Sequence, residues 1–310
     1  MRAGRMLRTA LGADVRAWLA QDDVVEVMLN PDGRLWVDRL GEGLADTDVT
    51  LGAAEGERII RLVAHHVAEE AHVTRPRVSA ELPETGERFE GLLPPVVAAP
   101  VFSIRKPAIR AVALNDYVEH GVMSSAQADA LSGAVAWRRN ILVAGGTASG
   151  KTTLTNALLA ELAGANERII VLEDTVELRC PAPNTVALRS KDGVASLTEL
   201  LRSTLRLRPD RIVVGEVRGP EALDLVKAWG TGHPGGIATV HGGTALGALS
   251  RLEQLIAEAA VTVPRALIAE TIEVIAVLAG RGPARRLTEL VAVQGLADGD
   301  YRLIPLGDAP

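Results

Sequence analysis

The pattern of hydrophobic residues changes about a third of the way along the chain. Up to residue 105, short runs in which apolar and polar residues alternate predict β-strands, and one amphipathic stretch, residues 55–71, predicts a helix. From residue 115 on, short apolar runs alternate with stretches in which leucine, alanine and valine recur at helical spacing. The first pattern indicates an α+β domain, and the second indicates a parallel sheet packed against helices.

The N-terminal pattern can be divided into elements by its turn signals. We expect a domain over residues 1–106, a linker over 107–114, where Pro107 stands in a stretch with little periodicity, and a second domain over 115–310. Asn30-Pro31-Asp32-Gly33 is a strong turn signal between two strands. The predicted elements of the first domain are a helix up to about residue 20, strands 24–29 and 34–40, helix 55–71, and strands 78–82, 87–93 and 100–105.

The C-terminal pattern alternates helices with strands. Ser196, with Glu199 three residues later, predicts a capped helix start, and Pro209 predicts where that helix has ended. A turn at 297–300 predicts a final hairpin. The predicted elements are helix 124–137, strand 141–143, a helix after residue 151, strand 168–172, helix 196–208, strand 212–214, helix 220–230, strand 237–240, helices 244–257 and 264–271, and strands within 274–306.

The most informative stretch for chemistry is residues 140–153, N-I-L-V-A-G-G-T-A-S-G-K-T-T. It contains G-x-x-x-x-G-K-[ST] between an apolar strand and a helical pattern, the context in which this motif binds a nucleotide triphosphate. A chance glycine-rich turn is the alternative, and the flanking strand and helix argue against it. The residues predicted to bind ATP are Gly145, Gly146, Thr147, Ala148, Ser149, Gly150, Lys151, Thr152 and Thr153.

The physical reason for this motif is the density of donors that a polyphosphate needs. Backbone N–H groups of the loop form a concave nest, and the helix that follows directs its positive end at the anion. Lys151 is expected to lie along the β- and γ-phosphates, and the Thr152 hydroxyl to complete the coordination of Mg²⁺.

Chemically active residues follow three other predicted core strands. Glu173 and Asp174 end one strand, Glu216 follows the next, and His241 follows a third. Ligands of open α/β sheets bind beyond the carboxyl ends of the strands, so these groups should converge on the loop. We expect Glu173 to orient and deprotonate water, Glu216 to hold Mg²⁺ through water, and His241 to sense the γ-phosphate. For each, a solvated strand end or a structural histidine is the alternative.

Composition narrows the function classes. The chain has 310 residues, 47% of them hydrophobic, and a net charge of −6, so no overall basic field indicates nucleic-acid binding. The single Cys180 excludes an internal disulfide and suits a reducing compartment. Arg8, Asp14 and Arg16 interrupt any apolar leader segment. We therefore expect a cytoplasmic protein.

Four motifs together resemble those of the secretion ATPase superfamily, which serves type II and type IV secretion and type IV pili. They are the phosphate loop at 145–153, I-V-L-E-D-T-V-E-L at 170–178, L-R-P-D-R-I-V-V-G-E-V-R-G at 207–219, and T-G-H-P-G-G-I-A-T-V-H-G-G at 231–243. The front half matches as well, through 29–38, 88–95 and 102–107. The short N-terminal domain and the S-I-R-K-P segment favour the conjugative-transfer ATPases of type IV secretion. A pilus-retraction ATPase is the nearest rival.

The resemblance implies more than the residues alone show. It implies a small α+β domain followed by a RecA-like P-loop domain, a ring-shaped hexamer, and attachment to the inner membrane through other secretion ATPases and membrane components. By motif position, Glu173 matches the family's catalytic glutamate, and Arg88 and Arg105 match basic residues that approach the phosphates. Direct DNA binding is unsupported, because the sequence has no basic stripe with interleaved aromatic residues. A nucleotide-gated scaffold that scarcely hydrolyses ATP remains the alternative function.

One residue departs from the family pattern inside the loop. Position 148 is alanine where glycine is usual. If the loop needs a positive φ at this position, alanine costs of order 1 kcal/mol, which would weaken nucleotide binding.

Overall fold

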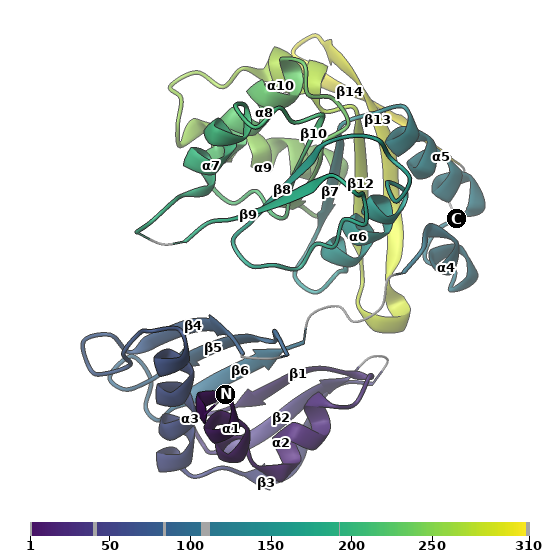
Figure 1. The fold of residues 1–310 in the computed structure, drawn as a ribbon. Helices are drawn as coiled ribbons and strands as arrows, with labels where there is room; N and C mark the ends of the chain where they lie inside the picture. The colour runs from purple at the N-terminus through teal and green to yellow at the C-terminus, as the bar shows by residue number, and fades with distance from the viewer. Residues whose placement is uncertain (1, 40–41, 83–84, 107–111, 192, 308–310) are drawn as a thin grey trace. The chain divides into compact units, whose positions relative to one another are not determined.

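The computed structural model describes residues 2–39, 42–82, 85–106, 112–191 and 193–307, and the chain divides into two compact units, 1–109 and 110–310 (Figure 1). Residues 107–111 of the predicted linker lie outside the described residues, and its last residue, Leu114, begins a helix. None of the described helices is long and apolar enough to cross a membrane.

The N-terminal unit is an antiparallel sheet with helices on one face (Figure 1). Its described strands run in the order β3-β2-β1-β6-β5-β4, and each neighbouring pair is antiparallel. The strands are β1 (Val24–Leu29), β2 (Arg34–Arg39), β3 (Gly43–Thr50), β4 (Arg77–Glu81), β5 (Arg88–Leu92) and β6 (Val101–Arg105), and the helices are α1 (Arg2–Ala10), α2 (Gly12–Leu19) and α3 (Ala53–His66).

The apolar faces of these helices and of the sheet form one core. Leu7 and Val15 from the first two helices and Ile59 and Val63 from α3 are buried together with strand residues such as Phe89. The spacing of Ile59 and Val63, four residues apart, places both on one face of α3, as the helical period requires.

The C-terminal unit contains an eight-stranded sheet among its described residues, in the order β14-β13-β12-β7-β11-β10-β8-β9. The six strands from β12 to β9 are parallel, and β13 and β14 extend the sheet in antiparallel fashion. The strands are β7 (Ile141–Gly145), β8 (Ile169–Glu173), β9 (Thr185–Arg189), β10 (Arg211–Val214), β11 (Ile237–His241), β12 (Val274–Ala279), β13 (Arg286–Ala297) and β14 (Asp300–Pro305).

Helices cover both faces of this sheet (Figure 1). One buried cluster joins α4, α5 and α6 to the sheet, and a second joins α7 to α10 to the opposite face. Strands β7, β8 and β10 are buried at every position, which explains their unbroken apolar runs. The helices are α4 (Leu114–Glu119), α5 (Ser125–Ala136), α6 (Lys151–Ala160), α7 (Leu197–Thr204), α8 (Glu221–Gly230), α9 (Ala245–Ala257) and α10 (Arg265–Thr271), with a 3₁₀ turn η1 (Gly282–Ala284).

The fold class expected from the motifs, an α+β domain followed by a RecA-like domain, is confirmed, and several element boundaries are corrected. The single helix expected up to residue 20 is two helices, because Gly12 has a φ of +78°. The helix expected over 55–71 ends at His66, just before Ala68, which is left-handed at +59°. The helix expected to reach 208 ends at Thr204, and Arg208 is again left-handed. Strands β3 and β9 and helix α4 were not predicted.

Candidate active site

The predicted phosphate loop joins β7 to α6 at the carboxyl edge of the sheet. The last residue of β7, Gly145, has no room for a side chain: a Cβ there would lie 2.3 Å from Ser149 Oγ and 2.6 Å from the Leu278 carbonyl oxygen. Gly150, just before α6, has a φ of +97°, which glycine adopts without strain. Glycine is therefore required at 145 because a Cβ has no space there, and at 150 because of the positive φ.

Ala148, the departure from the family pattern, is strained in this loop. Its φ is +62°, in the left-handed region. An alanine there costs about 1 kcal/mol relative to the ordinary helical region. The positive φ at which we expected alanine to be unfavourable is therefore present, and the loop is strained at this residue.

The two polar residues that open α6 already have partners on the loop and the neighbouring segment. Lys151 is 9% exposed, and its Nζ donates to the carbonyl oxygens of Gly145 at 3.0 Å and Gly146 at 3.1 Å. The Thr152 hydroxyl donates to Glu177 Oε2 at 3.1 Å. The ammonium group thus lies across the mouth of the loop, where a bound anion would have to face it.

Glu173 is a buried carboxyl group at the end of β8. Its side chain is 5% exposed, and Oε1 accepts the N–H groups of Glu177 and Leu178, each at 2.9 Å. Burial raises the pKa of Glu173 to about 7, because desolvation outweighs the two N–H groups that lower it. A carboxyl group with this pKa exchanges protons near neutral pH, as a general base must.

The neighbouring strand leaves room for this carboxyl group through a glycine. A Cβ at Gly215 would lie 2.9 Å from Glu173 Cγ. Gly215 ends the apolar run of β10 and directly precedes Glu216, so the same short segment both accommodates Glu173 and presents the second carboxylate.

Glu216 is joined to both flanking strand ends by charged side chains. Arg218 donates through Nε to Glu216 Oε2 at 2.8 Å and through Nη1 to Asp174 Oδ2 at 2.6 Å. Nε2 of His241 lies 2.7 Å from Glu216 Oε1, although this oxygen receives no well-directed hydrogen bond. The structure thus brings Asp174, Glu216 and His241 into one cluster, linked in part by an arginine.

This cluster and the loop lie at the same edge of the sheet. In the register of β11 and β7, His241 stands opposite Gly145, the first residue of the loop. Glu177 connects the loop to β8, since its side chain accepts from Thr152 and its N–H donates to Glu173. The side chains predicted at the strand ends are therefore grouped around the start of α6.

The oxygen ligands available at this edge suit Mg²⁺. The Thr152 hydroxyl and the Glu216 and Glu177 carboxylates are hard donors. Within the described ranges, no group of three or more His, Cys, Asp or Glu residues is placed to hold a metal by itself. Mg²⁺ in nucleotide sites is held mainly by phosphates, water and one or two protein oxygens, so this donor set fits it.

Three site residues were missed or undervalued from the sequence. Arg218 lies in the same quoted motif as Glu216, and its position two residues later was a usable signal. Glu177 lies in the quoted motif at 170–178, but nothing in the sequence indicates its bond to Thr152. Arg285, whose guanidinium lies against the loop at Gly150, gave no signal, because it is far away in the sequence.

Arg88 and Arg105 belong to the N-terminal unit. They stand directly opposite each other in the register of β5 and β6, so the two residues occupy neighbouring positions on the same face of the sheet. Arg105 is exposed and Arg88 is half-buried. Their predicted role toward the nucleotide stays a prediction.

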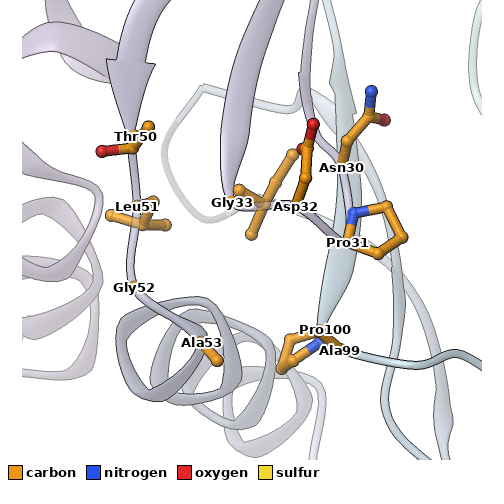
Figure 2. Close-up of a pocket in the computed structure, with 11 residues that line it drawn as sticks. Asn30, Pro31, Asp32, Gly33, Thr50, Leu51, Gly52, Ala53, Ala99 and Pro100 are labelled. Carbon is orange, nitrogen blue, oxygen red and sulfur yellow. The ribbon is translucent and has the colours of Figure 1, made fainter.

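A separate hollow in the N-terminal unit lies between the β1–β2 turn and the start of α3 (Figure 2). Its volume is about 410 Å³, and Asn30, Pro31 and Asp32 line one side while Gly52 and Ala53 line another. The carboxylate of Asp32 accepts the N–H of Arg34 at 3.0 Å, as a turn residue does. The lining lacks the grouped titratable side chains found around the phosphate loop.

Comparison with known proteins supports one family. The family model described as "Type II/IV secretion system protein" matches residues 60–287. The conjugal transfer protein TrbB of Rhizobium radiobacter is 48% identical over 300 residues, covering 96% of this chain and 92% of that protein. The type IV secretion system protein PtlH of Bordetella pertussis is 35% identical, covering 90% and 93%. The solved ATPase DotB of Legionella pneumophila shares the fold, with a TM-score of 0.63, 20% identity, and coverage of 93% and 79%.

Proposed function

Because this chain belongs to the type II/IV secretion ATPase family, we propose that it hydrolyses Mg²⁺-bound ATP to drive a conjugative type IV secretion machine. The observation that carries the proposal is Glu173, a buried carboxyl group with a pKa of about 7 that is connected through Glu177 to the phosphate loop. A carboxyl group whose pKa is raised by burial and which stands beside a phosphate loop is a candidate for proton transfer.

Residues 145–153 bind the triphosphate in this proposal. The backbone N–H groups of the loop and the first turn of α6 supply donors, and the positive end of that helix favours the anion. Lys151 exchanges its two carbonyl partners, at 3.0 and 3.1 Å, for phosphate oxygens. An ammonium–phosphate contact is charge-assisted, so it is stronger than either bond to a neutral carbonyl oxygen.

Thr152 and Glu216 would hold Mg²⁺, Glu216 through water. When bound, Mg²⁺ neutralises charge that develops on the phosphates. The Thr152 hydroxyl, which donates to Glu177 Oε2 at 3.1 Å, would supply one oxygen ligand for the ion. Glu216 has one oxygen held by Arg218, and its other oxygen, which lies 2.7 Å from His241 Nε2 without a well-directed hydrogen bond, would face the ion.

Glu173 is the general base. Its Oε1 is fixed by the N–H groups of Glu177 and Leu178, which leaves Oε2 to accept a proton from the attacking water. A positioned general base contributes about 10²- to 10⁴-fold to the rate. With a pKa of about 7, a substantial fraction of Glu173 is ionised at neutral pH and the carboxylate is still basic enough to take the proton.

His241, Arg88 and Arg105 are the remaining candidates of the catalytic set. His241 Nε2 lies 2.7 Å from the carboxylate of Glu216, so a movement of Glu216 would be transmitted through His241 to β11. Arg88 and Arg105 are candidates for cations that act on the triphosphate, a role that can contribute about 10³- to 10⁵-fold where an arginine completes a phosphoryl-transfer site.

We further propose a ring of identical subunits, most simply a hexamer, at the cytoplasmic face of the inner membrane, with other secretion ATPases and inner-membrane components as partners. The family membership supports this assignment. The net charge of −6 gives no support to direct DNA binding, so the transferred DNA is not proposed as a ligand of this chain.

The second candidate function is a nucleotide-gated scaffold that binds ATP but hardly hydrolyses it. The contacts among Arg218, Glu216 and His241 favour this function, because they stabilise the site when no ATP is hydrolysed. A pilus-retraction ATPase is less favoured, since the conjugal transfer relative is 48% identical over nearly the whole chain.

The test measures Mg-ATP binding and phosphate release on the full chain, beside Lys151→Ala and the exposed control Lys227→Ala. The proposal expects binding and release in the wild type and in Lys227→Ala, and neither in Lys151→Ala. If the wild type binds Mg-ATP but releases no phosphate at any protein concentration tested, the result would favour the scaffold.

A further inference from the structure

The structure points to a residue that shapes the phosphate loop from outside. We propose that Arg285 is a positioning residue that holds the loop in the conformation that receives phosphate, and that it offsets the strain of Ala148. This inference rests on the proposed nucleotide site at residues 145–153.

The connection between β12 and β13 brings Arg285 to the loop. Leu278 in β12 stands opposite Gly145 in β7, so the end of β12 lies directly beside the start of the loop. The chain then turns through η1 and reaches Arg285 immediately before β13. The sheet register thereby fixes the position of Arg285, which comes from a segment about 135 residues away in sequence.

The side chain of Arg285 lies against the loop at Gly150. A Cβ built on Gly150 would lie 2.8 Å from Nε, 2.9 Å from Cζ and 3.3 Å from Cδ of Arg285. The glycine at 150 therefore serves two needs, a φ of +97° and space for this guanidinium. Nη2 of Arg285 also points at the carbonyl oxygen of Ala148, 3.5 Å away.

The surroundings keep this guanidinium available for the loop. Nε of Arg285 is buried and has no hydrogen-bond partner among the described residues. The nearby hydroxyl of Tyr117 is buried and likewise unpartnered within the described part of the chain. Burial raises the pKa of Tyr117, and the positive charge of Arg285 opposes that rise, so the phenol cannot serve as an anionic partner near neutral pH. The loop carbonyl is then the acceptor that the cation faces.

This arrangement explains how the loop tolerates alanine at position 148. Ala148 and Gly150 are both left-handed, and the carbonyl oxygen of Ala148 is turned toward Arg285. Backbone N–H groups of successive residues in such a conformation form an anion nest on the other side. A cation on the carbonyl side stabilises the conformer in which the N–H groups face the phosphates. Without it, the strain at Ala148 favours conformers that bind phosphate less well.

Two simpler roles give different expectations. If Arg285 touches the nucleotide directly, its removal should weaken binding by the same factor whatever stands at position 148. If only its aliphatic stem packs against Gly150, Arg285→Met, which keeps a stem of similar length, should leave binding unchanged. A positioning role predicts an effect that depends on the residue at 148.

The experiment is a double-mutant cycle on the full chain, with the dissociation constant of Mg-ADP measured by calorimetric titration. The variants are Arg285→Met, Ala148→Gly and both together, with Arg281→Met as the matched control, an exposed arginine of the same connection. Removing an interaction that offsets a left-handed alanine should weaken binding about tenfold in Arg285→Met. In the Ala148→Gly background, glycine has little strain to offset, so the same change should weaken binding only about twofold.

The outcomes separate this inference from the proposed function. Arg281→Met should bind Mg-ADP as the wild type does. Equal losses in the two backgrounds, or no loss in either, would overturn the role of Arg285. If the wild type shows no Mg-ADP binding that Lys151→Ala removes, the proposed nucleotide site itself fails. Thermal unfolding of each variant checks that the fold is kept, and recovery in the double variant shows that Arg285→Met still folds.

Discussion

Replacing Glu173 with glutamine changes the charge of the proposed general base and very little else. The amide oxygen of glutamine can still accept the N–H groups of Glu177 and Leu178 that Oε1 accepts at 2.9 Å. The volume is conserved, so the close contact with Gly215 is kept. Glu173→Gln therefore removes the titratable proton site and leaves the local hydrogen bonds in place.

The raised pKa of Glu173 makes a prediction about stability as well as rate. The unfolded chain ionises this carboxyl group near its ordinary value of 4.5, whereas in the folded protein the pKa is about 7. Between these values the folded state holds a proton that the unfolded state has released, so stability falls as pH rises through this window. The shift corresponds to a cost of about 3 kcal/mol above pH 7, which is absent below pH 4.5.

Glutamine does not bear this cost. At pH 8, Glu173→Gln should therefore unfold at a higher urea concentration than the wild type, with a free energy of unfolding larger by up to about 3 kcal/mol. Near pH 4.5 the two proteins should have the same free energy of unfolding. Phosphate release should meanwhile fall by about 10²- to 10⁴-fold. In the wild type, kcat/KM should rise about tenfold between pH 6 and pH 8, since the ionised fraction grows from about a tenth to about nine tenths.

The assays are urea unfolding and steady-state phosphate release between pH 5 and pH 8.5. Glu57→Gln, which alters an exposed carboxylate paired with Arg61, is the control, and it should change neither quantity by much. A Glu173→Gln protein that is less stable than the wild type at pH 8, or that keeps its activity, would refute the reasoning from burial and pKa.

Three further substitutions test the site and the sheet beneath it. Gly215→Ala places a Cβ 2.9 Å from Glu173 Cγ, so phosphate release should fall by about 10²-fold while Mg-ADP affinity, measured by titration, stays the same. Glu216→Gln should lower phosphate release and raise the Mg²⁺ concentration needed for half-maximal hydrolysis, yet retain nucleotide binding, and an unchanged response to added Mg²⁺ would contradict the metal role. Arg211→Met leaves Glu167 without the buried guanidinium that it pairs with at 2.5 Å, so the free energy of unfolding in urea should fall by about 3 kcal/mol. A fall smaller than the measurement error would contradict the stabilising role of this ion pair.

The phosphate loop and the strand ends were predictable from sequence because each is encoded locally. The motif at 145–153 carries its own backbone requirement, and the apolar runs of β7, β8 and β10 end next to Gly145, Glu173 and Glu216. The rule that parallel strands place their carboxyl ends at one edge then brings these residues together without further information.

Other parts of the site depend on contacts that sequence does not display. Glu177 lies in an irregular segment between β8 and β9, and its bond to Thr152 follows from where that segment returns to α6. Arg285 reaches the loop only through the pairing of β12 with β7. Its position could not be deduced from spacing, because the intervening chain passes through most of the C-terminal unit.

The missed and shortened elements have a similar origin. Strand β9 is only partly buried, so it lacks the apolar run that identified the central strands. Helix α3 stops where Ala68 becomes left-handed, although the apolar pattern continues to Val67. Alanine and arginine residues at positive φ, such as Ala68 and Arg208, carry no marker in the sequence, and the tertiary structure imposes that conformation on them.

We propose that this chain is an ATPase whose activity depends on assembly and whose chemistry takes place at the carboxyl edge of the C-terminal sheet. The most direct test is the specific rate of phosphate release from Mg-ATP, measured over a wide range of protein concentrations beside Lys151→Ala. The account predicts that the specific rate rises with concentration to a plateau and that Lys151→Ala stays at background throughout. A wild type that equals Lys151→Ala at every concentration, although it binds nucleotide, would contradict it.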